Sequence, residues 1–191
     1  MAWIGTIEPK DATGALATLY EAIGSARQGV AEIHRVQSLN PRAMRAHLDL
    51  YKAVLFANSP LPRIARERIA VVVSAANECP YCISHHAEAL AQLGDDPQIH
   101  EALARGEVPE AVGPQQAALL RWAHRSTVAP AEVTEGDIAL VRAQGWDDRC
   151  ILDASLVIAY FNFVNRLVLT LGVHIEEGFA QMCGDDPSVS E

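Results

Sequence analysis

Residues 78–86 read ECPYCISHH, and they decide the fold because they place two of the chain's four cysteines beside a histidine at helical spacing. Proline is tolerated in the first turn of a helix, so Pro80 predicts a helix that begins next to Cys79. Cys82 and His86 then lie one turn apart on one face of this helix. The free N–H groups and the positive dipole end of a helix favour a thiolate over a thiol. The spacing therefore predicts a nucleophilic Cys82 with a base beside it.

A zinc site is the alternative interpretation of the same stretch. Two cysteines and two histidines could supply four ligands, but all of them fall between Cys79 and His86. Structural zinc sites usually draw a second ligand pair from a distant segment, and the sequence has no other Cys-x-x-Cys or His-x-x-x-His pair. Cys150 and Cys183 have no such neighbours and are expected to be structural. We therefore expect no metal and no other cofactor, with a non-catalytic zinc-stabilised helical module as the alternative.

The stretch from Glu67 to His86 resembles the AhpD-like alkylhydroperoxidase and carboxymuconolactone decarboxylase superfamily, in particular its peroxidase-related branch. The pattern of that superfamily is a glutamate, eleven residues, Cys-x-x-Cys, three residues and a histidine. Glu67, Cys79, Cys82 and His86 match it position for position. The resemblance implies an all-α, AhpD-like helical bundle that assembles as a homo-oligomer: a trimer, a dimer or a hexamer.

The chemistry of peroxide reduction assigns a role to each of these residues. It needs a thiolate that attacks one oxygen, a proton for the departing group, and a second thiol that condenses with the sulfenic acid. We assign the attack to Cys82, because His86 is one turn away, and the condensation to Cys79. His86 would take the Cys82 proton and later return it, while Glu67 orients and charge-balances the imidazole. In the resembling superfamily the glutamate, the histidine and the second cysteine play these parts.

Three residues of this stretch have alternative interpretations. Glu67 could instead form a surface salt bridge with Arg63 or Arg68 on its own helix. Tyr81, which stands where some members of the superfamily carry a histidine, is expected to pack at the rim of the thiol pocket. His85 is expected either to donate a hydrogen bond near the thiols or to be exposed.

These assignments predict a thiol-dependent peroxidase: an alkylhydroperoxidase-like antioxidant oxidoreductase of the peroxiredoxin type. Its partners would be a hydroperoxide substrate and a dithiol or disulfide-reducing protein that returns the electrons. The alternative enzyme is a disulfide reductase or a carboxymuconolactone decarboxylase-like enzyme. Decarboxylase chemistry uses a general base and has no use for two thiols, which argues against that version.

Composition sets the limits of these predictions. With 50% hydrophobic and 20% charged residues, the chain is expected to fold as a compact globular protein. A net charge of −9 and the lack of a basic cluster make nucleic acid an unexpected partner. The first residues show no charged segment followed by an apolar run, so we expect a cytoplasmic location, where Cys-x-x-Cys indicates a redox pair.

The most apolar stretch, residues 155–173, is expected to be a core helix. Asn162, Asn165 and Arg166 lie at its middle, and each would be costly in hydrocarbon, so no membrane partner is expected. Such polar groups need partners, and we expect Asn162 or Asn165 to help fix the oligomer or the floor of the pocket.

Proline, glycine and capping residues divide the rest of the chain into helices, with no alternating pattern typical of strands. We expect a single domain, 1–191, with N-terminal helices in 1–60, a motif-bearing core in 61–95 and C-terminal helices in 96–191. The first expected helix is capped by Asp11 and the second begins at Pro41. The others cover 64–76, a motif helix ending near Gly94, 98–105, 114–126, a segment capped at Thr134 and closed by Gly145, and 147–171.

Overall fold

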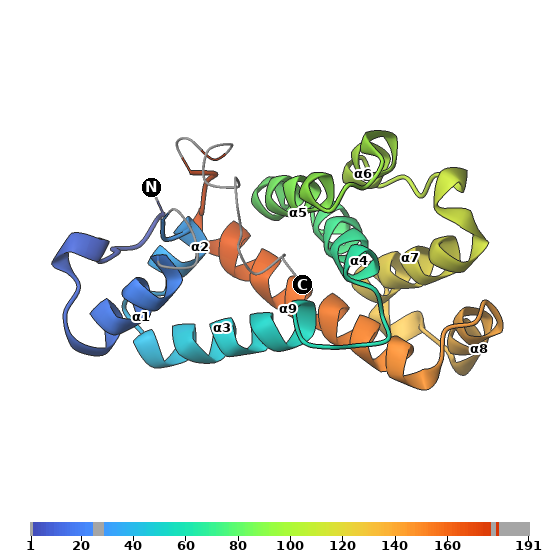
Figure 1. The fold of residues 1–191 in the computed structure, drawn as a ribbon, viewed down its shortest axis with the longest axis horizontal. Helices are drawn as coiled ribbons and strands as arrows, with labels where there is room; N and C mark the ends of the chain where they lie inside the picture. Colours follow the sequence, from blue (N-terminus) through green and yellow to red (C-terminus); the bar gives the residue numbers. More distant parts are fainter. Residues whose placement is uncertain (1, 25–28, 177–178, 180–191) are drawn as a thin grey trace. The chain divides into compact units, whose positions relative to one another are not determined.

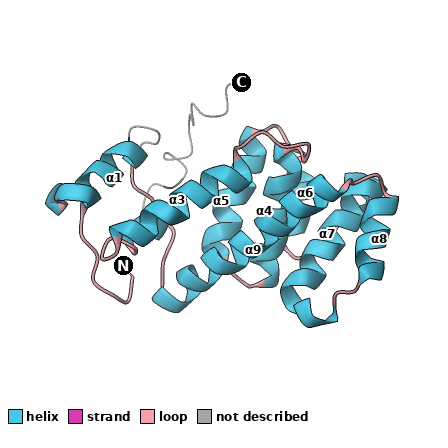
Figure 2. Ribbon diagram, turned by 90° about the horizontal axis from the view of Figure 1, so that it is seen from below, coloured by secondary structure: helices cyan, strands magenta, loops and turns pink. Residues whose placement is uncertain are grey.

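The computed structural model describes residues 2–24, 29–176 and 179, and over these residues the chain is built from α-helices, short 3₁₀ turns and loops, with no strand (Figures 1 and 2). The all-α prediction is confirmed. The α-helices of the described residues are α1 (Gly14–Gly24), α2 (Glu32–Arg35), α3 (Pro41–Leu55), α4 (Arg63–Ala76), α5 (Pro80–Gln92), α6 (Pro97–Ala104), α7 (Gly113–Val128), α8 (Glu135–Ala143) and α9 (Asp148–Leu171). The 3₁₀ turns are η1 (Pro9–Asp11), η2 (Glu110–Val112) and η3 (Pro130–Glu132).

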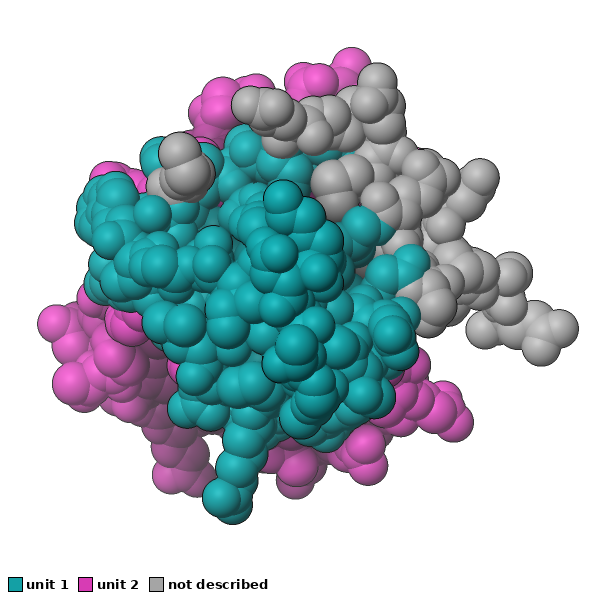
Figure 3. Space-filling view, turned by 90° about the vertical axis from the view of Figure 1, so that its left-hand side faces the viewer, with its two compact units in different colours: residues 1–50, 167–191 teal, residues 51–166 magenta. Residues whose placement is uncertain are grey.

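The chain forms two compact units, coloured separately in Figure 3. One unit contains residues 1–50 and 167–191, and the other contains residues 51–166. The boundaries between them fall within α3 and α9. The single domain over 1–191 and the homo-oligomer both stay predictions.

The central helix of the second unit is α4, which packs against α5, α6 and α7. Every residue from Ile69 to Ser74 is buried, including the run Val71, Val72 and Val73. β-Branched residues favour strands, but a helix that buries its whole circumference can accommodate them because tertiary packing outweighs local propensity. The predicted helix 64–76 is therefore confirmed with its valine run in place.

A buried arginine fixes the entry to α4. The Arg66 side chain is 5% exposed and donates to the backbone carbonyls of Leu55 at 2.7 Å, Ala57 at 2.9 Å and Leu61 at 2.9 Å. These carbonyls belong to the end of α3 and the loop after it, so one guanidinium satisfies three backbone acceptors of the connection.

The turn between α4 and α5 positions the cysteine motif. Glu78 has φ 53°, a left-handed conformation that reverses the chain after α4. The Cys79 N–H then donates to the Ser74 carbonyl at 2.9 Å, and Cys79 becomes the N-cap of α5 with Pro80 as its first residue. The helix start predicted from Pro80 is confirmed.

Two predicted helix caps have different outcomes. Thr134 caps α8 through a capping box, in which Asp137 accepts from the Thr134 N–H at 2.7 Å, as expected. The expectation that Asp11 begins the first helix is wrong. Pro9 starts a 3₁₀ turn that includes Asp11, whose N–H donates to Glu8, so α1 begins only at Gly14.

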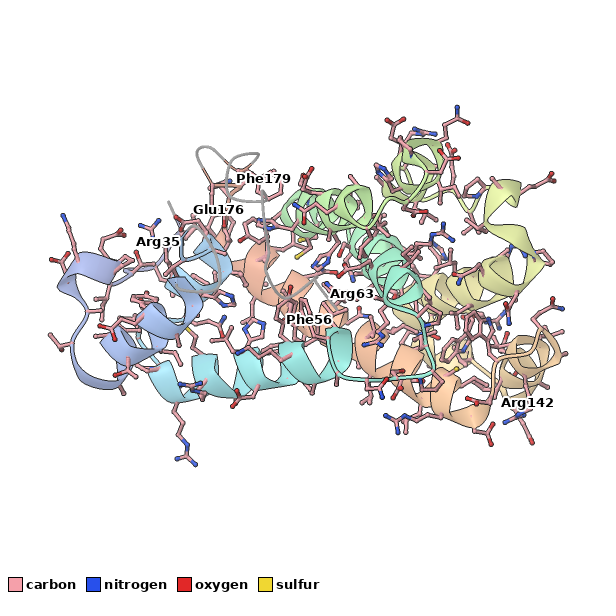
Figure 4. All side chains as sticks on the ribbon, viewed as in Figure 1. Arg35, Phe56, Arg63, Arg142, Glu176 and Phe179 are labelled. Atoms are coloured by element: carbon pink, nitrogen blue, oxygen red, sulfur yellow. The ribbon has the colours of Figure 1, made fainter. Side chains whose placement is uncertain are left out.

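In the first unit, α1 and the start of α3 share a hydrophobic core of Leu16, Leu19, Tyr20, Ile23, Met44 and Leu48. The Trp3 N–H donates to the Leu171 carbonyl at 2.8 Å, and the Trp3 ring would lie 2.3 Å from a Cβ at position 172, so Gly172 is required there. Glu176 accepts from the Glu32 N–H at 2.7 Å, and Arg35 pairs with Glu32 and Glu8; Figure 4 labels Arg35 and Glu176. These contacts join the first residues of the chain to residues 171–176.

Among the described residues, α9 is the one helix long and apolar enough to span a membrane. Length and composition alone decide that test, and the core helix of a folded domain also passes it. Asn165 on α9 is fully buried and donates to the Ser74 hydroxyl of α4 at 3.1 Å. This packing against another helix supports the expected core helix.

Candidate active site

The four residues of the superfamily pattern lie on α4 and α5, which pack against each other. Glu67 and Cys79 are completely buried, Cys82 is 2% exposed and His86 is 9% exposed. Of the four, Cys82 and His86 thus have the greatest access to solvent. Buried thiols and a buried carboxylate need hydrogen-bond partners, and the structure supplies them.

The central contact joins Glu67 to His86. The Oε2 atom of Glu67 lies 2.5 Å from Nδ1 of His86, and Oε1 accepts from Arg63 Nε at 2.9 Å and Nη2 at 2.5 Å. The carboxylate accepts, so His86 carries its proton on Nδ1 and leaves Nε2 free to act as a base. The structure therefore combines two expectations: Glu67 orients the imidazole and also pairs with Arg63, while Arg68 pairs elsewhere with Asp95.

The charge of Glu67 is held in place by its partners. Burial acts to raise the pKa of this carboxyl, but its interactions with His86 and Arg63 outweigh burial and lower the pKa below its usual range. Glu67 is therefore ionised at neutral pH. A fixed carboxylate at Nδ1 holds the imidazole ring in one orientation.

Aromatic side chains enclose the relay. The Phe161 ring meets the His86 ring edge to face, with centroids 4.5 Å apart, and Phe56 lies 3.7 Å beneath the Arg63 guanidinium carbon. Figure 4 labels Phe56 and Arg63, which lie together. Apolar walls of this kind exclude water and strengthen the charge interactions between them.

The cysteine pair is reduced, and its two sulfurs hydrogen-bond to each other. The hydrogen bond from Cys82, together with the backbone N–H groups of Cys82 and Tyr81, lowers the pKa of Cys79 against the effect of burial. The same bond to Cys79, added to burial, raises the pKa of Cys82 well above its usual range. Cys79 is therefore the more acidic thiol of the pair, and Cys82 donates a hydrogen bond to it.

This difference in acidity bears on the sequence-based prediction that the helix end makes Cys82 a thiolate. Cys79 is the N-cap residue of α5, and the backbone N–H groups of Tyr81 and Cys82 lower the pKa of its thiol. With a raised pKa, Cys82 would need a base to lose its proton. His86, one turn away on the same helix, stays the predicted base.

Comparison with known proteins decides the family. Residues 41–125 match the carboxymuconolactone decarboxylase family. An uncharacterized peroxidase-related protein from Silicibacter sp. TM1040 is 30% identical, over 89% of this chain and 87% of that one, with a TM-score of 0.76. The chain belongs to the AhpD-like carboxymuconolactone decarboxylase superfamily, in its peroxidase-related branch.

Two further solved structures share the AhpD-like fold. An uncharacterized peroxidase-related protein with an AhpD core, from Ralstonia eutropha JMP134, has a TM-score of 0.83 at 24% identity, over 95% of this chain and 96% of that one. The debrominase Bmp8, in a complex with 2,3,4-tribromopyrrole, has a TM-score of 0.76 at 17% identity, over 93% of each chain. At these identities the likeness concerns the fold.

The sequence predicted only in part that Asn165 contributes to the site. Its side chain, completely buried on α9, hydrogen-bonds to both Cys79 and Cys82. A polar residue in an apolar stretch indicated a role, and the expectation of a pocket floor named either Asn162 or Asn165. Asn162 instead donates to the Thr127 hydroxyl at 3.3 Å.

Tyr81 and His85, the two other predicted site residues, pack against each other. Tyr81 is 4% exposed, and its ring lies against the half-buried ring of His85, with centroids 4.4 Å apart. The expected packing role fits Tyr81.

In the part of the chain that the structure describes, no group of three or more His, Cys, Asp or Glu side chains is arranged to hold a metal ion, so the zinc alternative gains no support.

Proposed function

We propose that this protein is a thiol-dependent peroxidase, an alkylhydroperoxidase-like antioxidant oxidoreductase that reduces hydroperoxides through Cys79 and Cys82. One observation carries the proposal: two free, hydrogen-bonded thiols are buried at the start of the helix that bears His86, whose Nδ1 is held by a buried carboxylate. Membership of a superfamily with peroxidase-related members supports a coarse antioxidant or peroxidase-like role.

The first step is the attack on the peroxide. His86 Nε2 takes the proton of Cys82, and the Cys82 sulfur attacks the terminal oxygen of the hydroperoxide. The O–O bond breaks, an S–O bond forms, and the proton held by His86 passes to the departing alkoxide. The products are a sulfenic acid at Cys82 and one alcohol. Glu67 stabilises the imidazolium that exists between these two proton transfers.

The second step closes the disulfide. The Cys79 thiolate attacks the Cys82 sulfur, the S–O bond breaks, and the hydroxide takes a proton from solvent and leaves as water. A lowered pKa at Cys79 suits this role, because it favours the thiolate that attacks the sulfenic acid. An external dithiol then reduces the disulfide, and the sum is one hydroperoxide and one dithiol converted to an alcohol, water and a disulfide.

A disulfide reductase would use the second half of this cycle without the first. It needs the thiol pair but gives no task to the buried hydrogen bond between His86 and Glu67. Activity toward a model disulfide, measured beside activity toward an alkyl hydroperoxide, separates the two functions. A decarboxylase-like enzyme would keep its activity after both cysteines are replaced by serine.

The direct test is consumption of an alkyl hydroperoxide by single-cysteine variants, with dithiothreitol as the electron donor. Cys82→Ser is expected to abolish consumption, and Cys79→Ser to stop after one turnover with a sulfenic acid that dimedone labels. Cys150→Ser is the matched control, because Cys150 is buried on α9 outside the motif, and it is expected to retain full activity. Equal activity in all three variants would rule out the proposal.

A further inference from the structure

We propose that Asn165 is a thiolate-binding residue that selectively stabilises the reduced cysteine pair and so sets its reduction potential. This inference rests on the proposed function only for its biological use, since the chemistry concerns the thiol pair alone. Neither the sequence pattern of the superfamily nor the charge relay includes Asn165.

The orientation of the Asn165 amide is fixed by a chain of partners that begins at the backbone. The Val73 carbonyl can only accept, and it receives Asn77 Nδ2 at 3.0 Å. The same nitrogen lies 3.0 Å from Asn165 Oδ1. Since Asn77 Nδ2 is a donor, Asn165 must present its oxygen there and its own nitrogen on the opposite side.

That nitrogen faces the reactive motif. One of its two hydrogens goes to the Ser74 hydroxyl at 3.1 Å, and the other is directed to the sulfurs of Cys79 and Cys82. Ser74 also accepts the Cys79 N–H on its backbone carbonyl, at 2.9 Å. The donor and the sulfurs are therefore both positioned by α4, and all four side chains are at most 2% exposed.

A donor held in this way distinguishes the two redox states. When a thiol of the reduced pair is ionised, this donor binds an anion, and charge-assisted hydrogen bonds are about twice as strong as neutral ones. In the disulfide it faces two neutral sulfurs that accept weakly. A contact that favours the reduced, ionised state makes the disulfide a stronger oxidant, so removal of the contact shifts the reduction potential to more negative values.

The test measures the redox equilibrium of the pair in Asn165→Asp and Asn165→Ala. Asn165→Asp conserves the side-chain volume but replaces the N–H donor by a carboxylate oxygen that repels a thiolate. If Asn165→Ala does not fold, Asn165→Asp still decides the test. Reduction by a dithiothreitol redox buffer is followed by thiol alkylation and mass. We expect the equilibrium constant for reduction to fall about tenfold, which equals ~30 mV. The pH profile of alkylation should move to higher pH.

Asn162→Ala is the matched control. Asn162 also accepts from Asn77, at 3.1 Å, and lies on the same helix, but its own donor is directed to Thr127. Its equilibrium constant is expected to stay within about twofold of the unchanged protein. An unaltered potential and alkylation profile in Asn165→Asp would overturn the inference. Because neither readout uses a peroxide, failure of the peroxidase assay in the unchanged protein would overturn the proposed function alone.

Discussion

Glu67 of α4 lies 2.5 Å from His86 of α5, with the carboxylate of the first residue against Nδ1 of the second, and neither α4 nor α5 alone contains the pair. The contact couples a fully buried carboxylate to one ring nitrogen of His86 and leaves the other nitrogen for proton transfer in the proposed reaction. It predicts that Glu67 contributes to proton transfer without touching the peroxide.

Glu67→Gln tests this contribution. The amide keeps the size of the side chain and can still accept from Nδ1, but it no longer offsets the charge of an imidazolium. We expect the turnover of an alkyl hydroperoxide to fall about 10²-fold, with little change in the apparent affinity for peroxide. Glu88→Gln, which changes a half-buried glutamate on α5, is the control. Equal losses in the two variants would contradict the relay.

The ion pair between Arg68 and Asp95 predicts a large effect on stability. It is bidentate, at 3.0 and 2.5 Å, with side-chain exposures of 11% and 4%, and it fixes the loop after α5 to α4. Asp95→Ala leaves a nearly buried guanidinium without its partner, and we expect it to lower the free energy of unfolding by about 3 kcal/mol. Urea denaturation measures this change.

Two further variants show whether the cause is the unpaired charge. Replacing Arg68 by Met in the Asp95→Ala background is expected to recover much of the loss, because it removes the stranded charge. Glu107→Ala breaks the exposed pair with Arg105 and is expected to cost less than about 1 kcal/mol. A double variant as unstable as Asp95→Ala would show that the charge is not the cause.

His47 predicts a loss of stability in acid. It is 4% exposed, Gln37 Nε2 donates to its Nδ1 at 2.7 Å, and burial lowers its pKa to about 4. Between its ordinary pKa and pH 4 the unfolded chain binds a proton that the folded chain does not, so stability falls as pH falls through this window. The loss attributable to His47 is about 2 kcal/mol at pH 5 relative to pH 8.

The measurement is urea denaturation of the unchanged protein and of His47→Gln at several pH values. Other acidic groups titrate in both proteins, so the difference between the two curves isolates His47. We expect His47→Gln to lose less stability on acidification. Parallel curves would show that the pKa of His47 is not lowered in the folded protein.

Local patterns in the sequence were sufficient for most helix boundaries. Pro80 predicted the start of α5, and Thr134 that of α8, because proline geometry and side-chain caps act over a few residues. The helix α2, at four residues, is too short to produce a periodic pattern, and it was missed. The Asp11 cap failed because Pro9 starts a competing 3₁₀ turn.

The part of the site that lies on one helix was predictable from the sequence. The spacing of Cys79, Cys82 and His86 on a single helix follows from the sequence. The partition of charge between the two thiols does not follow, since it depends on which backbone N–H groups face each sulfur. Asn165 lies 83 residues beyond Cys82, and only the packing of α9 on α4 brings it to the motif.

The central claim is that Cys79 and Cys82 form a disulfide when the reduced protein meets one equivalent of an alkyl hydroperoxide. Counting free thiols before and after the addition tests it most directly, because the count needs no knowledge of the natural substrate. The account predicts a fall from four thiols to two per chain, with a peptide that joins residues 79 and 82 in the mass spectrum. Four thiols after the addition, or the same loss in Cys82→Ser, would contradict it.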